Sequence, residues 1–345
     1  MLPAMRIHLT KLRLRLPVVT PILAAILLAS VPSGASARAY LPPRHEIWQG
    51  VAIQPISDYQ HATGKHPAVY QVFSAWGEYL PAIFADAQAA RARLMIHIST
   101  ASGSTEAITP GQIARGDGDG WLIALNQEIA ATHEITYVRL MAEMDAYWND
   151  YSAFNANGTR RSADHSTAAY RQAWRRVTLI LRGGTRRSIN AALRKLHMPA
   201  LGGSGNLPAA PVAMVWVPQV AGAPDIAGNQ PSDYYPGRRW VDWVGTDFYS
   251  KFPNFTGLTS FYNEFRGAPF AFGEWGIWGA DNPGFVDELF GWIGAHPRVR
   301  MLVYNQGYGD LAFDLRNFPR AAARVRAWMW GGRFPGYAPE WAKSR

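Results

Sequence analysis

Two glutamates stand at the ends of otherwise apolar runs, and their placement suits acid–base chemistry. Glu143 closes the run 139–142, and Glu274 closes the run 269–273. Two carboxylates facing one cleft can cleave a glycosidic bond, because one protonates the leaving oxygen while the other attacks the anomeric carbon or activates a water. An apolar strand beneath Glu143 would also favour its protonated form. Either glutamate alone could equally be a strand-end residue paired with an arginine.

The elements that must position these glutamates are short apolar strands separated by longer helical segments. The eight predicted strands are Trp48–Gln54, Val69–Trp76, Arg93–Ser99, Tyr137–Met144, Pro211–Pro218, Val241–Ser250, Pro269–Gly276 and Val299–Gln306. The predicted helices are Tyr79–Ala92, Gly120–Thr132, Thr167–Leu181, Ser188–Leu196, Phe285–Ala295 and Pro319–Met329. Parallel strands need long crossovers, so this alternation predicts an α/β fold, a (β/α)8 TIM barrel.

In such a barrel the fourth and seventh strands face one another across the mouth. Active sites of these barrels lie at the carboxyl ends of the strands, so Glu143 and Glu274 are expected to share one cleft. An open doubly wound sheet is the alternative architecture. It should carry a glycine-rich phosphate-binding turn after its first strand, and the sequence has none there.

Several motifs occur in one order along the chain, at residues 113–119, 139–148, 173–177, 235–245 and 272–276. Together they resemble glycoside hydrolase family 26, the β-mannanase family of the large retaining barrel clan, over roughly residues 45–330. The resemblance implies that Glu143 is the general acid/base and Glu274 the nucleophile. It also implies a double displacement through a glycosyl-enzyme.

Side chains near the strand ends supply the candidates for substrate binding. They are His97, Asp145, Trp148, Trp216, Tyr249, Trp275, Trp278 and Tyr304. The tryptophans offer flat apolar faces for stacking on sugar rings, although at least one is expected only to pack at the barrel rim. Tyr249 is expected to donate a hydrogen bond to Glu274. A lone strand-end histidine such as His97 is also typical of a satisfied structural group.

Two residues beside the candidate acid/base depart from the similar family. That family usually carries His directly before this glutamate and Asn two residues after it, where this chain has Ala142 and Asp145. A charged Asp145 would raise the pKa of Glu143 by repulsion. The expected activity is therefore an endo-β-1,4-mannanase-like one, with β-glucan and β-xylan as alternatives. A carbohydrate-binding barrel with little or no catalysis is the alternative from another class.

The N-terminal segment has the pattern of a secretory signal peptide. Four basic residues precede an apolar stretch from Leu16 to Ala29, and the small residues Ala35-Ser36-Ala37 follow. We therefore predict residues 1–37 as a signal peptide cleaved near Ala37, residues 38–345 as one catalytic domain, and a secreted protein. The apolar stretch is short for a membrane span, so no membrane association is expected after cleavage.

The composition narrows the partners. The chain has no cysteine, which excludes disulfides and sulfur-bound metals. The formal charge is +9, and removal of residues 1–37 leaves +5, because four basic and no acidic residues are lost. The basic residues are scattered and no nucleic-acid motif accompanies them, so no nucleic-acid partner is expected. We expect a monomer acting on a polysaccharide or oligosaccharide, with no cofactor and no metal site, since the run Asp117–Gly120 lacks the later acidic ligand of a calcium loop.

Overall fold

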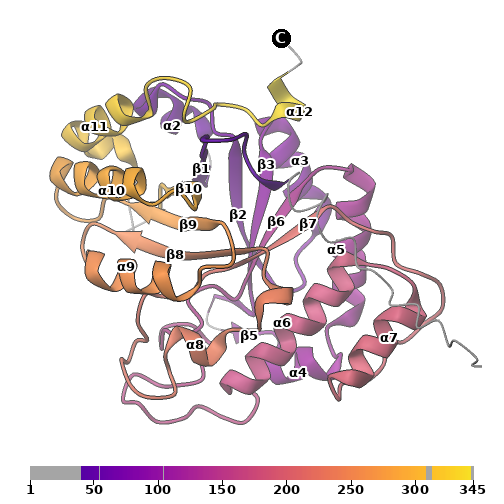
Figure 1. Ribbon diagram of the computed structural model, residues 1–345. Coiled ribbons are helices and arrows are strands. Elements are labelled where there is room, and N and C mark those ends of the chain that lie inside the picture. The colour runs from indigo at the N-terminus through magenta and orange to yellow at the C-terminus, as the bar shows by residue number, and fades with distance from the viewer. Residues whose placement is uncertain (1–39, 54, 104, 308–312, 343–345) are drawn as a thin grey trace, which may run out of the picture. The chain divides into compact units, whose positions relative to one another are not determined.

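Eight parallel strands close into a barrel in the order β1-β10-β9-β8-β7-β6-β3-β2 (Figure 1). They are β1 Trp48–Ala52, β2 Val69–Ala75, β3 Arg93–Ser99, β6 Thr136–Leu140, β7 Val212–Trp216, β8 Trp243–Tyr249, β9 Phe270–Gly276 and β10 Val299–Asn305. The computed structural model describes residues 40–53, 55–103, 105–307 and 313–342, all within one compact unit. The predicted (β/α)8 TIM barrel is confirmed.

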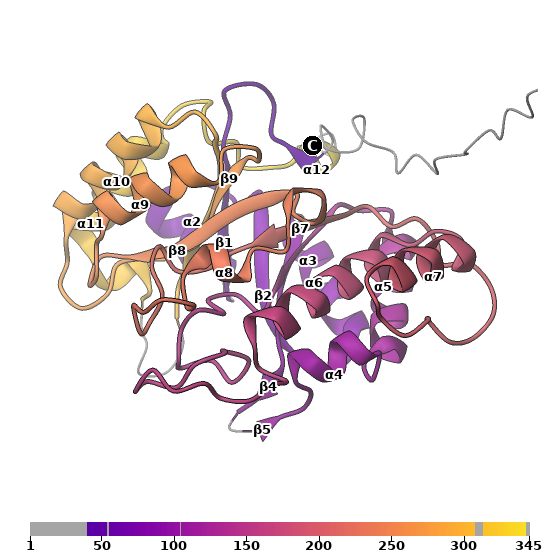
Figure 2. The same cartoon turned by 60° about the horizontal axis from the view of Figure 1, so that its bottom comes forward.

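Helices surround the barrel and lie in the connections between its strands and after the last strand (Figures 1 and 2). They are α2 Ile56–Thr63, α3 Leu80–Ala90, α4 Pro110–Arg115, α5 Asp119–Thr132, α6 Thr167–Arg182, α7 Arg186–Lys195, α8 Pro231–Tyr234, α9 Phe255–Glu264, α10 Pro283–Ala295, α11 Pro319–Met329 and α12 Pro339–Ala342. The sequence sets several of their starts. The hydroxyl of Ser166 accepts from the backbone N–H of Ala169, which caps α6 in the way helix N-termini favour. A two-residue hairpin, β4 Ala101–Ser102 and β5 Thr105–Glu106, lies outside the barrel.

One predicted strand is too long. The apolar run Tyr137–Met144 was expected to be extended throughout, but β6 ends at Leu140. Met141 and Glu143 have positive φ angles of 46° and 53°, a conformation that a strand does not allow. Glu143 therefore stands on a turn just beyond the strand. This backbone is uncommon for residues with a Cβ and marks the position as locally constrained.

The two ends of the barrel differ in what covers them. At the amino ends of the strands, Arg93 forms an ion pair with Glu340 of α12 at 2.6 Å and donates to the hydroxyl of Tyr137 at 3.0 Å. Tyr137 in turn donates to the backbone oxygen of Tyr40 at 2.5 Å. Both chain ends of the described part thus close this end of the barrel. The polar groups at the carboxyl ends of the strands form the site described below.

Some predictions concern features outside the barrel. The predicted signal peptide, residues 1–37, lies outside the described residues. None of the helices from residue 40 to residue 342 that the structure describes has the length and apolarity needed to cross a bilayer. Asp119, in the run considered as a calcium loop, forms an ion pair with the buried Arg176 at 2.5 Å. Within the described ranges, no three His, Cys, Asp or Glu side chains cluster in a way that could hold a metal ion.

Candidate active site

Glu274 lies near the end of β9 and accepts hydrogen bonds from side chains of four other strands, β2, β6, β8 and β10. Its Oε1 accepts from Arg139 Nη1 at 2.7 Å. Its Oε2 accepts from the hydroxyl of Tyr249 at 2.5 Å and from Asn305 Nδ2 at 2.9 Å. Gln71 Nε2 approaches Oε1 at 3.4 Å. The predicted hydrogen bond from Tyr249 is confirmed, and both carboxylate oxygens are fixed in orientation.

Arg139 supplies the positive charge that pairs with the buried carboxylates of Glu274 and Asp247. Its guanidinium is fully buried and also contacts Asp247 Oδ2 at 2.6 Å. Burial alone would raise the pKa of Glu274, but the charge of Arg139, with smaller contributions from His97 and Tyr249, brings it below its ordinary value. Glu274 is therefore ionised at neutral pH, as a nucleophile must be.

Glu143 has a looser set of partners. The turn that carries it is fixed through its backbone, because its N–H donates to Val217 O at 2.7 Å and its carbonyl accepts from Asn149 Nδ2 at 2.9 Å. Its carboxylate accepts from Trp148 Nε1 at 2.9 Å. The Trp148 side chain is 53% exposed, so this contact lies at the open side of the site.

The pKa of Glu143 shifts in the opposite direction to that of Glu274. Burial and then the negative charge of Glu274 raise the pKa of Glu143. Like charges in one site cannot both ionise easily, so the carboxyl away from Arg139 retains its proton to higher pH. The pair therefore combines one ionised carboxylate with one proton-holding carboxyl, which is the division of roles that a glycosidase acid and nucleophile need.

Three of the predicted sugar-binding residues point away from the barrel interior. Trp216, Trp275 and Tyr304 are all fully buried. Trp216 packs at 4.9 Å from the ring of Phe265, just after α9, and Trp275 packs at 5.5 Å from Phe290 of α10. Successive side chains of a strand point to opposite faces, and these three lie on the face covered by helices. Their prediction as substrate contacts is corrected to packing between barrel and helices.

Asp145 is also buried. Its Oδ1 accepts from the backbone N–H of Gln219 at 2.9 Å, and its Oδ2 has no partner within the described residues. Burial, opposed in part by that hydrogen bond, raises the pKa of Asp145 well above its ordinary value. Its contacts tie the β6 loop to the β7 loop, and none of its surface reaches the cleft. The prediction that it binds substrate is corrected to this structural role.

His97 lies inside the barrel, in register with Arg139 on the neighbouring strand. Neither ring nitrogen has a hydrogen-bond partner within the described residues, and the ring packs edge-on against Phe73 at 5.3 Å. Burial and the charge of Arg139 lower the pKa of His97 to about 3, so the ring is neutral. A neutral imidazole with unused nitrogens remains suited to a sugar hydroxyl, and this prediction stands untested.

Trp278, the remaining predicted tryptophan, is partly exposed beside the Glu274 network. Its ring lies 5.8 Å from that of Tyr249 and 5.1 Å from that of Phe313. Trp148 and Trp278 are therefore the two predicted tryptophans whose rings reach the open side of the site. One lies beside each glutamate.

Three polar side chains, Gln71, Arg139 and Asn305, complete the site without having been assigned to it from sequence. Asp247, a polar residue near the end of the predicted strand Val241–Ser250, joins them. Arg139 and Gln71 each interrupt an apolar strand with a polar residue that is fully buried. Buried polar groups require partners, so such residues in one barrel could have been expected to meet in its interior. That signal was available, although it does not say which strands would bring them together.

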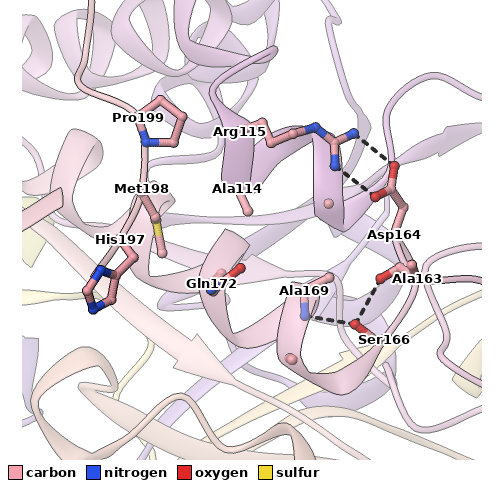
Figure 3. A pocket seen from close by; sticks show the side chains of 12 residues that line it. Ala114, Arg115, Ala163, Asp164, Ser166, Ala169, Gln172, His197, Met198 and Pro199 are labelled. Carbon is pink, nitrogen blue, oxygen red and sulfur yellow. Dashed lines mark hydrogen bonds and ion pairs between the residues drawn. The ribbon is translucent and has the colours of Figure 1, made fainter. Parts of the chain in front are cut away.

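A cavity of about 240 Å³ lies on the flank of the barrel, between α4, the start of α6 and the segment after α7 (Figure 3). Arg115 and Asp164 line it and pair with one another at 2.8 Å. None of the residues of the Glu143–Glu274 network lines this cavity. It is therefore separate from the candidate active site.

The structure is similar to solved structures of glycoside hydrolase family 26. GH26A from Muricauda sp. has a TM-score of 0.57 and 16% identity, with 88% of this chain and 97% of that chain covered. Bacillus subtilis mannanase BCman has a TM-score of 0.53 and 16% identity, with coverages of 87% and 93%. The family 26 domain of a Prevotella bryantii endo-β-mannanase/endo-β-glucanase has a TM-score of 0.53 and 12% identity, with coverages of 87% and 92%.

No family model matches the sequence, and no curated protein matches it. At identities this low, the structural likeness demonstrates the fold. The barrel implied by the sequence resemblance is therefore shared with these family 26 structures. What the chain does has to be argued from its own carboxylates.

Proposed function

We propose that the protein is a retaining glycoside hydrolase acting on a β-linked polysaccharide. The observation that carries the proposal is the opposite pKa shift of two carboxyl groups in one site: Glu274 lowered beside Arg139, and Glu143 raised by burial and by Glu274. Pairs of titratable groups with diverging pKa values mark the acid and the base of a site. The fold shared with family 26 mannanases supports the same division of roles.

In the first step Glu274 attacks the anomeric carbon while Glu143 gives its proton to the glycosidic oxygen. The carbon–oxygen bond to the leaving sugar breaks, and an ester bond to Glu274 forms. The hydrogen bonds from Tyr249 and Asn305 to Oε2 hold the carboxylate in place during attack. Arg139 keeps it ionised before attack.

In the second step a water replaces the leaving sugar. Glu143, now deprotonated, takes a proton from this water, and the water oxygen attacks the anomeric carbon. The ester bond to Glu274 breaks, which frees the nucleophile and restores the proton on Glu143. Two inversions at one carbon give net retention of configuration.

For the substrate we propose β-1,4-mannan first, because the similar structures include mannanases from Bacillus subtilis and Prevotella bryantii. β-Glucan and β-xylan are the alternatives, since Ala142 and Asp145 depart from the resembled family beside the acid/base. The partly exposed rings of Trp148 and Trp278 supply stacking surfaces on either side of the carboxylates.

We further propose that the enzyme acts as a secreted monomer after cleavage near Ala37. The basic residues before the apolar stretch Leu16–Ala29 support export. N-terminal sequencing of the protein recovered from the medium of an expressing cell checks the cleavage position. Light scattering of the same sample checks the oligomeric state.

The test of the proposed activity is the release of reducing ends from mannan, mixed-linkage glucan and xylan. We expect one polymer to be cleaved by the parent protein. Glu143→Gln and Glu274→Gln should each lose at least about 10³-fold of that rate, because each removes a group required in the transition state. Glu288→Gln, at an exposed position on α10, is the matched control and should keep full activity.

Cleavage that persists at parent rates in either active-site variant would refute the carboxylate mechanism. Cleavage of no polymer by a protein that binds oligosaccharides would instead support the non-catalytic carbohydrate-binding barrel. Thermal unfolding of each variant shows whether a lost activity reflects lost chemistry or a lost fold.

A further inference from the structure

A lysine and several aromatic rings lie beside the Glu274 side of the site. Lys251 and Phe252 come shortly after β8, and Trp278 comes shortly after β9. The ring of Trp278 lies 5.8 Å from that of Phe252 and 5.8 Å from that of Tyr249. We call Tyr249, Phe252 and Trp278 the aromatic platform. Because the hydroxyl of Tyr249 is 2.5 Å from Glu274 Oε2, the platform is continuous with the candidate nucleophile.

The platform is open to a ligand. Phe252 is 68% exposed, which is unusual for a large apolar side chain, and Trp278 is partly exposed. Exposed aromatic faces beside polar groups are typical of carbohydrate recognition, because the C–H face of a sugar packs on the ring while its hydroxyls remain in water. The platform therefore suits a sugar residue next to the one that reacts.

Lys251 adds a positive charge to this surface. Its Nζ lies 4.7 Å from the ring centroid of Trp278 and 5.4 Å from that of Phe252. An aromatic face attracts an ammonium group, but it leaves the three N–H donors of that group available to a better acceptor. Within the part of the chain that the structure describes, no carboxylate forms an ion pair with Lys251.

The described acidic residues of the neighbouring loops are already engaged. Asp281, between β9 and α10, accepts from the backbone N–H of Arg320 at 2.9 Å and from that of Ala321 at 2.8 Å, both in α11. Asp314, between β10 and α11, pairs with Arg316 at 2.6 Å. Among the described residues, the charge of Lys251 is thus left without a carboxylate partner.

We infer that the aromatic platform binds a sugar residue carrying a carboxylate or another anionic substituent, with Lys251 as its ion-pair partner. The sugar ring packs on the exposed ring of Phe252, with the ring of Trp278 beside it at an interplanar angle of 85°, and the anionic group meets the ammonium. The net positive charge of the chain, +5 without residues 1–37, favours the approach of an anionic polymer. The inference rests on the proposed function, and it adds to it a preference for acidic or acid-substituted forms of the β-linked polysaccharide.

The test uses pairs of oligosaccharides that differ only in charge. Calorimetry on the full-length Glu274→Gln protein measures binding without turnover. The first pair is β-1,4-mannohexaose and the β-1,4-mannuronate hexamer, and the second is cellohexaose and its glucuronate counterpart. In at least one pair we expect the acidic member to bind at least tenfold more tightly, with an affinity that falls as salt is added.

Variants at position 251 assign this preference to the lysine. Lys251→Met keeps an unbranched side chain over the rings but removes the charge. It should weaken the affinity for the acidic oligosaccharide at least tenfold and change the affinity for the neutral one less than twofold. Lys251→Arg should retain the preference. Lys195→Met, at an exposed position on α7, is the matched control and should change the affinity for neither oligosaccharide.

The inference is overturned if the acidic member of neither pair binds more tightly, or if Lys251→Met leaves the preference intact. These results remain separate from those for the proposed function. Cleavage of a neutral polymer by the parent protein, with no effect of Lys251→Met, would refute only the inference. Lysine-dependent binding of an acidic oligosaccharide that the parent protein never cleaves would refute only the hydrolase activity.

Discussion

The two candidate catalytic carboxylates are held in contrasting ways. Glu274 belongs to a strand, is 7% exposed, and accepts hydrogen bonds from side chains of four other strands, Gln71, Arg139, Tyr249 and Asn305. Glu143 stands on a turn with a φ of 53°, and its carboxyl group accepts from the exposed indole of Trp148 and shares a hydrogen bond with Asp247. The strand-held group keeps one ionisation state, and the turn-held group keeps access to solvent and to a departing or arriving oxygen.

This difference matches what the two steps of the proposed reaction ask of each group. A nucleophile should be charged before attack and fixed in direction, whereas an acid/base must gain and lose a proton in every cycle. Substitutions in the Glu274 network should therefore reduce activity more than substitutions around Glu143. The predictions below test that ranking.

The largest effect is expected from Arg139→Met. This change leaves Asp247 and Glu274 as buried carboxylates without their cation, and loss of one partner of a buried pair costs about 3–5 kcal/mol. Denaturant unfolding measures the loss, and activity should fall below detection. Arg182→Met, which breaks a partly exposed pair with Asp242, should cost about 1 kcal/mol or less. Equal costs for the two variants would contradict the central role of Arg139.

Tyr249→Phe should be next in size. A hydrogen bond to a charged group is worth about 1.5–3 kcal/mol, so kcat should fall on the order of 10-fold to 10²-fold. The hydroxyl helps to lower the pKa of Glu274, so its loss raises that pKa and moves the acidic limb of the kcat/KM profile to higher pH. Tyr79→Phe, at a side chain 75% exposed, is the control. An unmoved acidic limb would refute this role of Tyr249.

Trp148→Phe should have a smaller effect, of about tenfold or less, because the indole contact is exposed. The N–H of Trp148 stabilises the ionised form of Glu143 and so opposes the rise of its pKa. Without it the pKa of Glu143 rises further, and the alkaline limb of kcat/KM moves to higher pH. A shift of the acidic limb instead would mean that the roles of the two glutamates are exchanged.

Asp145→Asn should have the smallest effect on stability, within about 1 kcal/mol at acidic pH, because burial favours the neutral carboxyl and the amide oxygen can still accept from Gln219. The folded-state pKa of Asp145 lies well above its ordinary value of 3.8. Its contribution to stability is therefore lost as pH rises from that value through the raised pKa. The variant should gain in Tm relative to the parent as the pH is raised above 3.8. A gain on acidification would contradict the buried neutral carboxyl.

The fold could be predicted from sequence because its elements are bounded by clear local signals. The strand Arg93–Ser99 and the helix Pro319–Met329 have the bounds expected from sequence. The apolar run Tyr137–Met144 gave the wrong end for β6, because a turn through residues with a Cβ has no Gly or Pro to reveal it. That turn positions Glu143, so the error falls at the functional site.

The two glutamates could be identified because each is a lone acid at the end of an apolar strand. Their neighbours were harder to assign. Barrel strands are buried on both faces, so their sequences show no alternation that separates inward from outward positions. The sequence alone therefore does not show that Trp216, Trp275 and Tyr304 face the helices. A register shift between Thr246 and Asp247 further obscures which residues of β8 turn inward.

The measurement that tests the division of roles most directly is azide rescue of two alanine variants. The substrate is an aryl β-glycoside of an oligosaccharide from the polymer that the parent protein cleaves. With Glu274→Ala, azide should take the place of the missing nucleophile and give the α-glycosyl azide. With Glu143→Ala, azide should attack the glycosyl-enzyme and give the β-glycosyl azide. The same anomer from both variants, or rescue of neither, would contradict the account.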